Sequence, residues 1–253
     1  MYGTYLRWAR FFLFCLLCFT PGMAFAADVA LPGIEVTVSG VQDSEKTANA
    51  LKIILGLTVL SLAPALLIVM SSFTRIIVVL AMLRHAFGMQ QTPPNTVLIG
   101  LALFLTVYNM MPVMQVIDRE SFQPFMNNSI DTKEAFNRAM NPLRDFMVRQ
   151  TREGDLALMV KLSNEEMPAS IDEIKNYQLI PAFMISELKT AFQIGFVVFL
   201  PFLIVDLVVA SILMSMGMLM VPPMMISLPI KILMFVLIDG WNIVVNALMS
   251  SFN

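Results

Sequence analysis

Long runs of apolar residues with few interrupting charges dominate the hydrophobic pattern of this chain. A run of 18 residues forms a helix about 27 Å long, close to the roughly 30 Å of a bilayer core. Four stretches reach this length: 53–70, 96–117, 191–213 and 226–248. The pattern predicts an all-α, membrane-associated protein built from kinked helical hairpins, the first over residues 53–117 and the second over residues 181–253.

A charged region separates the two predicted hairpins. Residues 118–175 carry 11 acidic and 8 basic side chains, more than half of the chain's 16 basic and 18 acidic residues. The same region contains apolar residues at the three- and four-residue spacings of an amphipathic helix: Phe136, Met140, Leu143, Phe146 and Met147. We therefore expect residues 118–180 to form a charged helical region in which the amphipathic stretch Phe136–Phe146 docks neighbouring copies, and residues 53–253 to form one helical domain.

The N-terminus has the pattern of a cleaved secretory signal peptide over residues 1–26. Arg7 and Arg10 precede the apolar run 11–19, and small residues at 24 and 26 form a cleavage site. A retained anchor helix is the alternative, but the run is short for a membrane span. Residues 27–52 form a polar N-terminal segment, and both cysteines lie within the signal, so we expect no disulfide framework.

The charge distribution predicts a topology for the four apolar stretches. Cleavage of the signal places Ala27 outside the cytoplasm, and the stretch 53–70 then runs inward. Arg75 and Arg84 would lie in a short cytoplasmic loop, in agreement with the positive-inside rule. The charged region 118–175 would then be external.

The sequence contains no recognisable enzyme motif. His85 is the one histidine, which excludes paired-histidine zinc motifs, and neither a nucleophile elbow nor a phosphate-binding loop is present. No basic run indicates nucleic-acid binding. We therefore expect a protein that is not an enzyme and that needs neither a cofactor nor a metal ion.

Four charged residues in or next to the last apolar stretches are candidate functional residues: Glu187, Asp206, Lys231 and Asp239. A charged group within an apolar helix costs about 2.5–3.5 kcal/mol on insertion scales, so such a group normally has a partner or a task. One interpretation is an intramembrane aspartyl protease that uses Asp206 and Asp239 as acid and base. Because Lys231 can serve as a counter-ion, salt bridges within or between subunits are the favoured interpretation.

Methionine is frequent, with 22 residues, and it concentrates near one turn. Met214, Met216, Met218 and Met220 alternate before Pro222 and Pro223, which mark the turn of the second hairpin. Thioether sulfurs could bind copper, but alternate residues of a helix point about 200° apart. Flexible core packing and a soft loop that seals a pore are the other interpretations.

Three blocks in the second half of the chain closely resemble signatures of the FliP family of type III secretion export-gate subunits. The first block is PAFMISELKTAFQIGF at 181–196. The second includes PFLIVD at 201–206, GM at 217–218 and PP at 222–223, and the third includes LPIK at 228–231 and FVLIDGW at 235–241. The resemblance extends over essentially all of the chain after the signal peptide. It implies a helical, pore-forming subunit of the flagellar export gate in the bacterial inner membrane and basal body, with much of the chain on the periplasmic side. An equivalent subunit of a virulence secretion system is the alternative.

The resemblance also implies partners and site residues. The family assembles as a pentamer with FliQ and FliR in contact with membrane lipid, works with FlhB and FlhA, and passes unfolded flagellar proteins. Its methionine-rich loop forms a gasket around the closed pore, and the matching residues here are Met218, Leu219 and Met220. Glu187, Asp206 and Lys231 are then expected to contribute to subunit contacts and gate stability.

Overall fold

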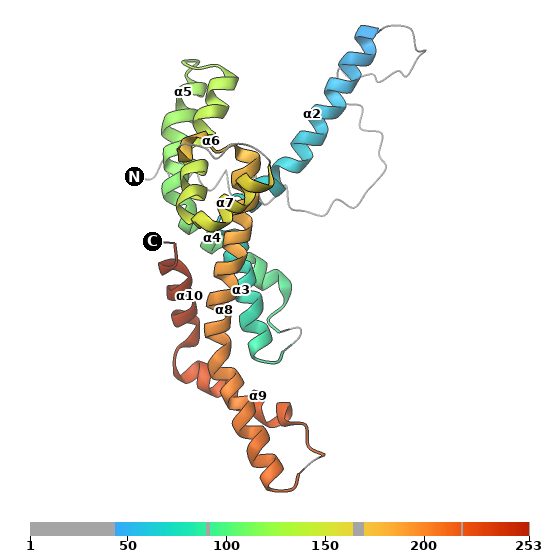
Figure 1. Cartoon of the computed structure of the whole chain (residues 1–253), viewed down its shortest axis with the longest axis vertical. Coiled ribbons are helices and arrows are strands. Elements are labelled where there is room, and N and C mark those ends of the chain that lie inside the picture. The colour runs from blue at the N-terminus through green and yellow to red at the C-terminus, as the bar shows by residue number, and fades with distance from the viewer. Residues whose placement is uncertain (1–43, 90–91, 164–169, 219, 253) are drawn as a thin grey trace. The chain divides into compact units, whose positions relative to one another are not determined.

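Helices are the regular elements of the described chain, which we analysed as a computed structural model (Figure 1). The structure describes residues 44–89, 92–163, 170–218 and 220–252. The predicted signal peptide, most of the segment 27–52, and Leu219 lie outside the described residues. In chain order the longer helices are α2 (Ser44–Val69), α3 (Phe73–Ala86), α4 (Asn95–Ile117), α6 (Thr132–Gln150), α7 (Glu153–Leu162), α8 (Asn176–Ser215), α9 (Pro223–Leu237) and α10 (Gly240–Ser250).

The all-α, membrane-associated prediction is confirmed. Among the residues that the structure describes, three helices are long and apolar enough to cross a membrane: α2, α4 with its extension, and α8. The last predicted apolar stretch, 226–248, is divided between α9 and α10, which are bent by 67° relative to each other. Together these two helices could form a fourth span. The extension of α4 is a π-helical turn, Asp118–Phe122, followed by the short α5, Gln123–Met126.

Helices α3 and α8 lie side by side and run in the same direction. Arg75 contacts Glu187 near one end of the pair, and the ring of Phe87 meets that of Phe202 edge-on near the other. Between them, a Cβ on Gly195 would lie 2.3 Å from the sulfur of Met82, so this glycine permits the close approach of the two helices. The expectation that Arg75 and Arg84 lie in a connecting loop is wrong, since both belong to α3 and Arg75 is buried within it.

Two clusters of buried apolar residues hold the unit Ile53–Asn253 together. One joins α3, α4, α8, α9 and α10, and its centre is the contact of Phe87 with Phe202 and Phe235. The other joins α4 and α6 to the start of α8, where Phe146 packs against Phe183. Phe146 and Met147 of the predicted amphipathic helix are buried in this second cluster, whereas Phe136 is 63% exposed.

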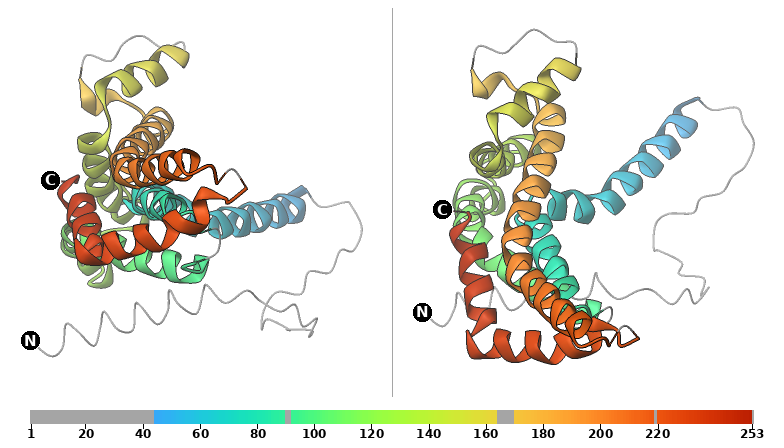
Figure 2. Two further views of the ribbon diagram at one scale, coloured as in Figure 1. Left: turned by 90° about the horizontal axis from the view of Figure 1, so that it is seen from below. Right: turned by 60° about the horizontal axis from the view of Figure 1, so that its bottom comes forward.

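The α8–α9–α10 segment forms a bent hairpin, drawn in orange to red in Figure 2. Helix α8 extends to Ser215, α9 returns from the turn, and α10 leaves the end of α9 in a new direction. The bend occurs where Asp239 adopts a left-handed backbone conformation, with φ of 52°. Gly240 follows, and a Cβ there would lie 2.2 Å from the ring of Phe235, so a larger residue would not fit without movement.

Candidate functional site: buried ion pairs and a methionine-rich turn

The hairpin of α8 and α9 brings Asp206 and Lys231 together. Lys231 Nζ donates to Asp206 Oδ2 at 2.6 Å and to the carbonyl oxygen of Ala86 at 3.1 Å. Lys231 is buried, whereas the side chain of Asp206 is 43% exposed. One lysine therefore joins α9 to α8 and also binds the last carbonyl of α3, where a positive charge is favourable.

Glu187 is paired inside the chain as well. The Nε atom of Arg75 donates to Glu187 Oε2 at 2.9 Å, and Nη2 donates to Oε1. Both side chains are almost fully buried. This fork geometry matches a planar guanidinium to a carboxylate with two parallel bonds, the arrangement for which arginine is suited.

Arg75 has further partners on two other segments. Its Nη1 donates to the carbonyl oxygen of Ser251 at 2.7 Å and to the hydroxyl of the same residue at 3.0 Å. Its Nη2 also donates to Gln150 at 2.9 Å, and its guanidinium carbon lies 3.9 Å from the centroid of the Phe252 ring. The guanidinium therefore connects α3, α6, α8 and the C-terminal end of the chain.

Sequence reasoning did not identify Arg75, Gln150 and Ser251 as members of this site. The signal for Arg75 was present, because an arginine next to an apolar run needs a partner if the run is buried. Gln150 and Ser251 carry no such signal. Their role depends on the contact between chain segments far apart in sequence, which hydrophobic spacing does not report.

The two aspartates of the protease hypothesis occupy different levels of the hairpin. Asp206 faces Lys231, and Phe202 lies next to Phe235, so residues on the two helices pair in a common antiparallel register. Asp239 lies eight residues beyond Lys231, a helical rise of about 12 Å. It accepts a hydrogen bond from Asn242 at 3.2 Å. A shared-proton pair requires carboxyl groups about 3 Å apart, so this register does not favour the dyad.

The methionine-rich turn begins with a glycine cap at the end of α8. Gly217 has a φ of 73°, a conformation that favours glycine. The N–H of Met218 donates to the carbonyl of Leu213, and the N–H of Gly217 donates to that of Met214. These two bonds form a Schellman motif, which satisfies carbonyls that the helix end leaves without partners.

Pro222 and Pro223 begin the returning helix. Pro222 is the N-cap of α9, and Pro223 is the first helical residue. The first helical position suits proline, because its missing N–H has no partner there in any case and its φ is already helical. The glycine cap and the proline pair therefore fix both ends of a short turn.

The described methionines of this turn are exposed. Met216 and Met218 are exposed, and Met220 is 98% exposed. Across the described residues, no group of three or more histidine, cysteine, aspartate or glutamate side chains could hold a metal ion. The arrangement presents exposed methionine side chains at the tip of a hairpin whose two helices are joined by the Asp206–Lys231 ion pair.

Comparison with known proteins identifies the family of the chain. The model of the FliP family matches residues 56–248. The flagellar biosynthetic protein FliP of Bacillus subtilis (strain 168) is 50% identical over 217 residues, which cover 86% of this chain and 98% of that protein. The protein of the same name from Pectobacterium carotovorum subsp. carotovorum is 48% identical over 230 residues, covering 91% and 89% of the two chains. That of Treponema pallidum (strain Nichols) is 43% identical over 224 residues, covering 88% and 83%. The chain therefore belongs to the FliP family.

Proposed function

We propose that this chain is a pore-forming subunit of the flagellar protein export gate, which passes unfolded flagellar proteins across the inner membrane. The observation that carries the proposal is the match to relatives named flagellar biosynthetic protein, at 50% and 48% identity over most of both chains. These names also favour a flagellar role over the equivalent role in a virulence secretion system.

The exposed apolar surface supports an assembly in the membrane. In the most apolar segment of α8, only 17% is buried within the chain. In that of α4 with its extension, 28% is buried. Apolar surfaces of this size require lipid or other protein chains to cover them. In the proposed gate, copies of this chain form a pentamer, FliQ and FliR complete the assembly, and FlhB and FlhA act with it.

The methionine-rich turn is the proposed seal of the pore. Methionine is unbranched and flexible, so its side chain can fill irregular gaps and adapt to different neighbours. Met218, Leu219 and Met220 of each subunit would meet around the closed channel and give way to an exported chain. The proline pair and the glycine cap would hold this turn in a fixed position relative to α8 and α9.

The ion pairs are proposed to keep the hairpin rigid during transport. Glu187 and Lys231 are buried within the chain, whereas Asp206 and Asp239 are partly or largely exposed. In the assembled gate, Asp206 and Asp239 would therefore be the charged residues available to neighbouring subunits. Glu187 and Lys231 would contribute to gate stability through the position of α8 and α9.

Replacement of the proposed seal by alanine tests this function. Cells without the chromosomal gene would express either the native chain or a variant with alanine at 218, 219 and 220. We expect the variant to raise passive ion leakage through the assembled gate, because alanine removes most of the apolar volume at the tip. Leakage would be followed as growth inhibition by added salt and as uptake of a membrane-impermeant dye.

A matched variant makes the result specific to the turn. Met224 and Met225 are also exposed but belong to α9, after the two prolines. Alanine at these two positions should leave leakage at the native level. Equal leakage from the native chain and the triple variant, at equal amounts of assembled gate, would contradict the proposed seal. Swimming by cells that lack the chain would contradict the export role itself.

A further inference from the structure

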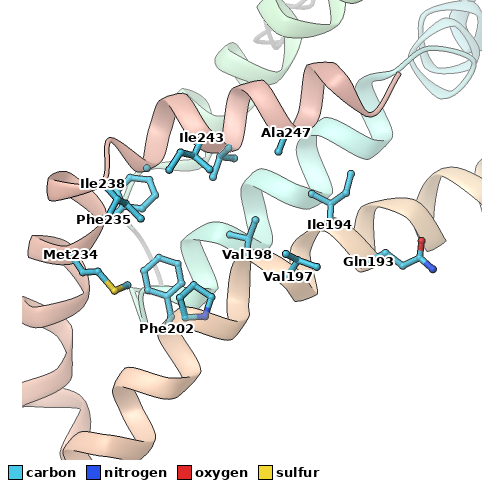
Figure 3. Close-up of a pocket in the computed structure, with 13 residues that line it drawn as sticks. Gln193, Ile194, Val197, Val198, Phe202, Met234, Phe235, Ile238, Ile243 and Ala247 are labelled. Atoms are coloured by element: carbon cyan, nitrogen blue, oxygen red, sulfur yellow. The ribbon is translucent and has the colours of Figure 1, made fainter. Parts of the chain in front are cut away.

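An apolar pocket of about 450 Å³ lies between α8, α9 and α10 (Figure 3). Val197 of α8 lies on one side of the pocket, and Ile243 and Ala247 of α10 lie on the other. Phe202 and Phe235 pack against each other at the end where α9 joins α10. The volume is within the range of typical small-molecule sites.

The polarity of the pocket changes along its length. Among the thirteen described residues that line it, Gln193 alone has a polar side chain, and it lies at the end opposite Phe202. The residues from Ile194 to Phe202 on α8 carry no charge. A ligand that fills this pocket therefore needs a long apolar part and a polar group at one end only.

An arginine stands at the polar end. The Nη2 atom of Arg152 donates to Gln193 Oε1 at 2.6 Å and to Thr190 Oγ1 at 3.0 Å. The backbone N–H of Arg152 donates to Ser186 at 3.1 Å, which fixes the residue against α8. Arg152 is an exposed residue, and within the part of the chain that the structure describes its guanidinium hydrogen-bonds to neutral oxygens and to no carboxylate. It is therefore positioned to bind an anion at the mouth of the pocket.

The depth of the pocket corresponds to one leaflet of a bilayer. Nine residues separate Gln193 from Phe202 on α8, which is a helical rise of about 13 Å. Half of a bilayer core is about 15 Å. A phosphate group bound to Arg152 would therefore place an attached acyl chain along the pocket, with its end near Phe202 and Phe235.

We propose that this pocket binds one acyl chain of an anionic phospholipid, with the lipid phosphate held by Arg152. The lipid would cover the apolar faces of α8 and α10 where they do not pack against each other. It would thereby stabilise the bend between α9 and α10. This proposal does not depend on the pore function, because lipid binding can be measured without transport.

Native mass spectrometry of the full chain, purified from membranes with the subunits that accompany it, tests the site. The probes are phosphatidylglycerol and phosphatidylcholine with identical acyl chains, added in detergent. We expect retention of one phosphatidylglycerol per chain in preference to phosphatidylcholine. Arg152→Gln should reduce this preference about five-fold, the effect of one basic residue near an anionic lipid surface, and Arg152→Lys should retain most of it.

Two matched controls separate the site from general lipid contact. Arg149 is an exposed arginine three residues earlier, and Arg149→Gln should leave the preference unchanged. Val197 and Val208 are both exposed residues of α8, but only Val197 lines the pocket. Val197→Trp should displace the lipid by filling the pocket, and Val208→Trp should not.

The result that would overturn the proposal is equal retention of the two lipids, or equal loss from the Arg152 and Arg149 variants. A photo-crosslinking amino acid at position 197 provides a second measurement in the assembled complex. Crosslinking to phospholipid is expected. Crosslinking mainly to another polypeptide would identify the pocket as a contact between protein chains and would also overturn the lipid assignment.

Discussion

Arg75 shows how much of this fold depends on a single side chain. It donates hydrogen bonds to Glu187, Gln150 and Ser251, which belong to three different segments. A buried guanidinium is costly to desolvate, and that cost is offset only when its donors are satisfied with good geometry. The cluster around Arg75 meets this condition, so its members should be sensitive to substitution.

Removal of the carboxylate from this cluster should destabilise the chain strongly. Glu187→Ala leaves the buried charge of Arg75 without its counter-ion, and loss of one partner of a buried pair costs about 3–5 kcal/mol. The measurement is the free energy of unfolding of the purified protein in detergent.

An exposed ion pair on α6 offers the control for Glu187. Glu134 accepts a hydrogen bond from Arg138 at 2.8 Å, and both side chains are almost half exposed. Glu134→Ala should change the free energy of unfolding by only about 0.5 kcal/mol. Equal effects of the two substitutions would show that burial of the Arg75 pair contributes no additional stability.

The second ion pair should respond unequally to loss of its two members. Lys231 is 3% exposed, whereas the side chain of Asp206 is 43% exposed. Asp206→Asn leaves a buried ammonium without a counter-ion, while Lys231→Met leaves a carboxylate that still reaches the surface. We therefore expect Asp206→Asn to reduce swimming and thermal stability more than Lys231→Met does. The reverse order would contradict the burial argument.

At this scale the sequence was a good guide to which residues are unusual and a poor guide to their partners. Glu187, Asp206 and Lys231 stand out because charge is rare in apolar stretches. Spacing along one helix does not determine which residue of another helix lies opposite. For that reason the pairing of Asp206 with Lys231, and of Glu187 with Arg75, required the structure.

Among the elements, the turn between α8 and α9 is the one whose geometry most clearly follows from residue type. Gly217 occupies a left-handed position, with φ of 73°, and a Cβ there would meet no other atom within 4 Å. Glycine is therefore favoured at position 217 by the backbone conformation and not by crowding from neighbouring atoms. Alanine in this conformation costs about 1 kcal/mol, and asparagine costs less.

Substitutions at Gly217 test the cap directly. Gly217→Ala should lower the thermal midpoint and impair swimming, and Gly217→Asn should retain more of both. Gly154 has a helical conformation in α7 and also has open space at its Cβ position. Gly154→Ala should therefore cause no loss of stability, since alanine is the better helix former. A loss at Gly154 as large as that at Gly217 would contradict the role of the left-handed conformation.

The elements themselves were largely predictable because their signals are local. Paired prolines interrupt the helical chain as expected: Pro93 and Pro94 precede α4, and Pro222 and Pro223 begin α9. The bend at Asp239 was not predicted, since the apolar pattern continues through it. The start of α8 at Asn176 was also missed, because Gln178, Ser186 and Glu187 are polar and yet buried against neighbouring segments.

At the scale of the whole molecule, contacts between distant segments turn separate hairpins into one unit. Arg75 lies in α3 of the first hairpin and contacts Ser251 and Phe252, which follow the last helix of the second. Gln150 connects the same place to the end of α6, because its Nε2 donates to the carbonyl of Phe252 at 3.0 Å. The C-terminal residues should therefore stabilise α3, α6 and α8 as well as α10.

A double-mutant cycle can measure this coupling. A chain that ends at Ser250 loses the Ser251 oxygens and the Phe252 ring that contact Arg75. We expect the truncation to lower the free energy of unfolding and to expose α6 and α8 to protease, although neither helix is shortened. Arg75→Met removes the same contacts from the other side. If the contacts are the cause, truncation should cost much less in the Arg75→Met background, with an interaction energy of about 0.5–3 kcal/mol. Additive effects would mean that the contacts of Arg75 with Ser251 and Phe252 do not couple the C-terminal residues to α3.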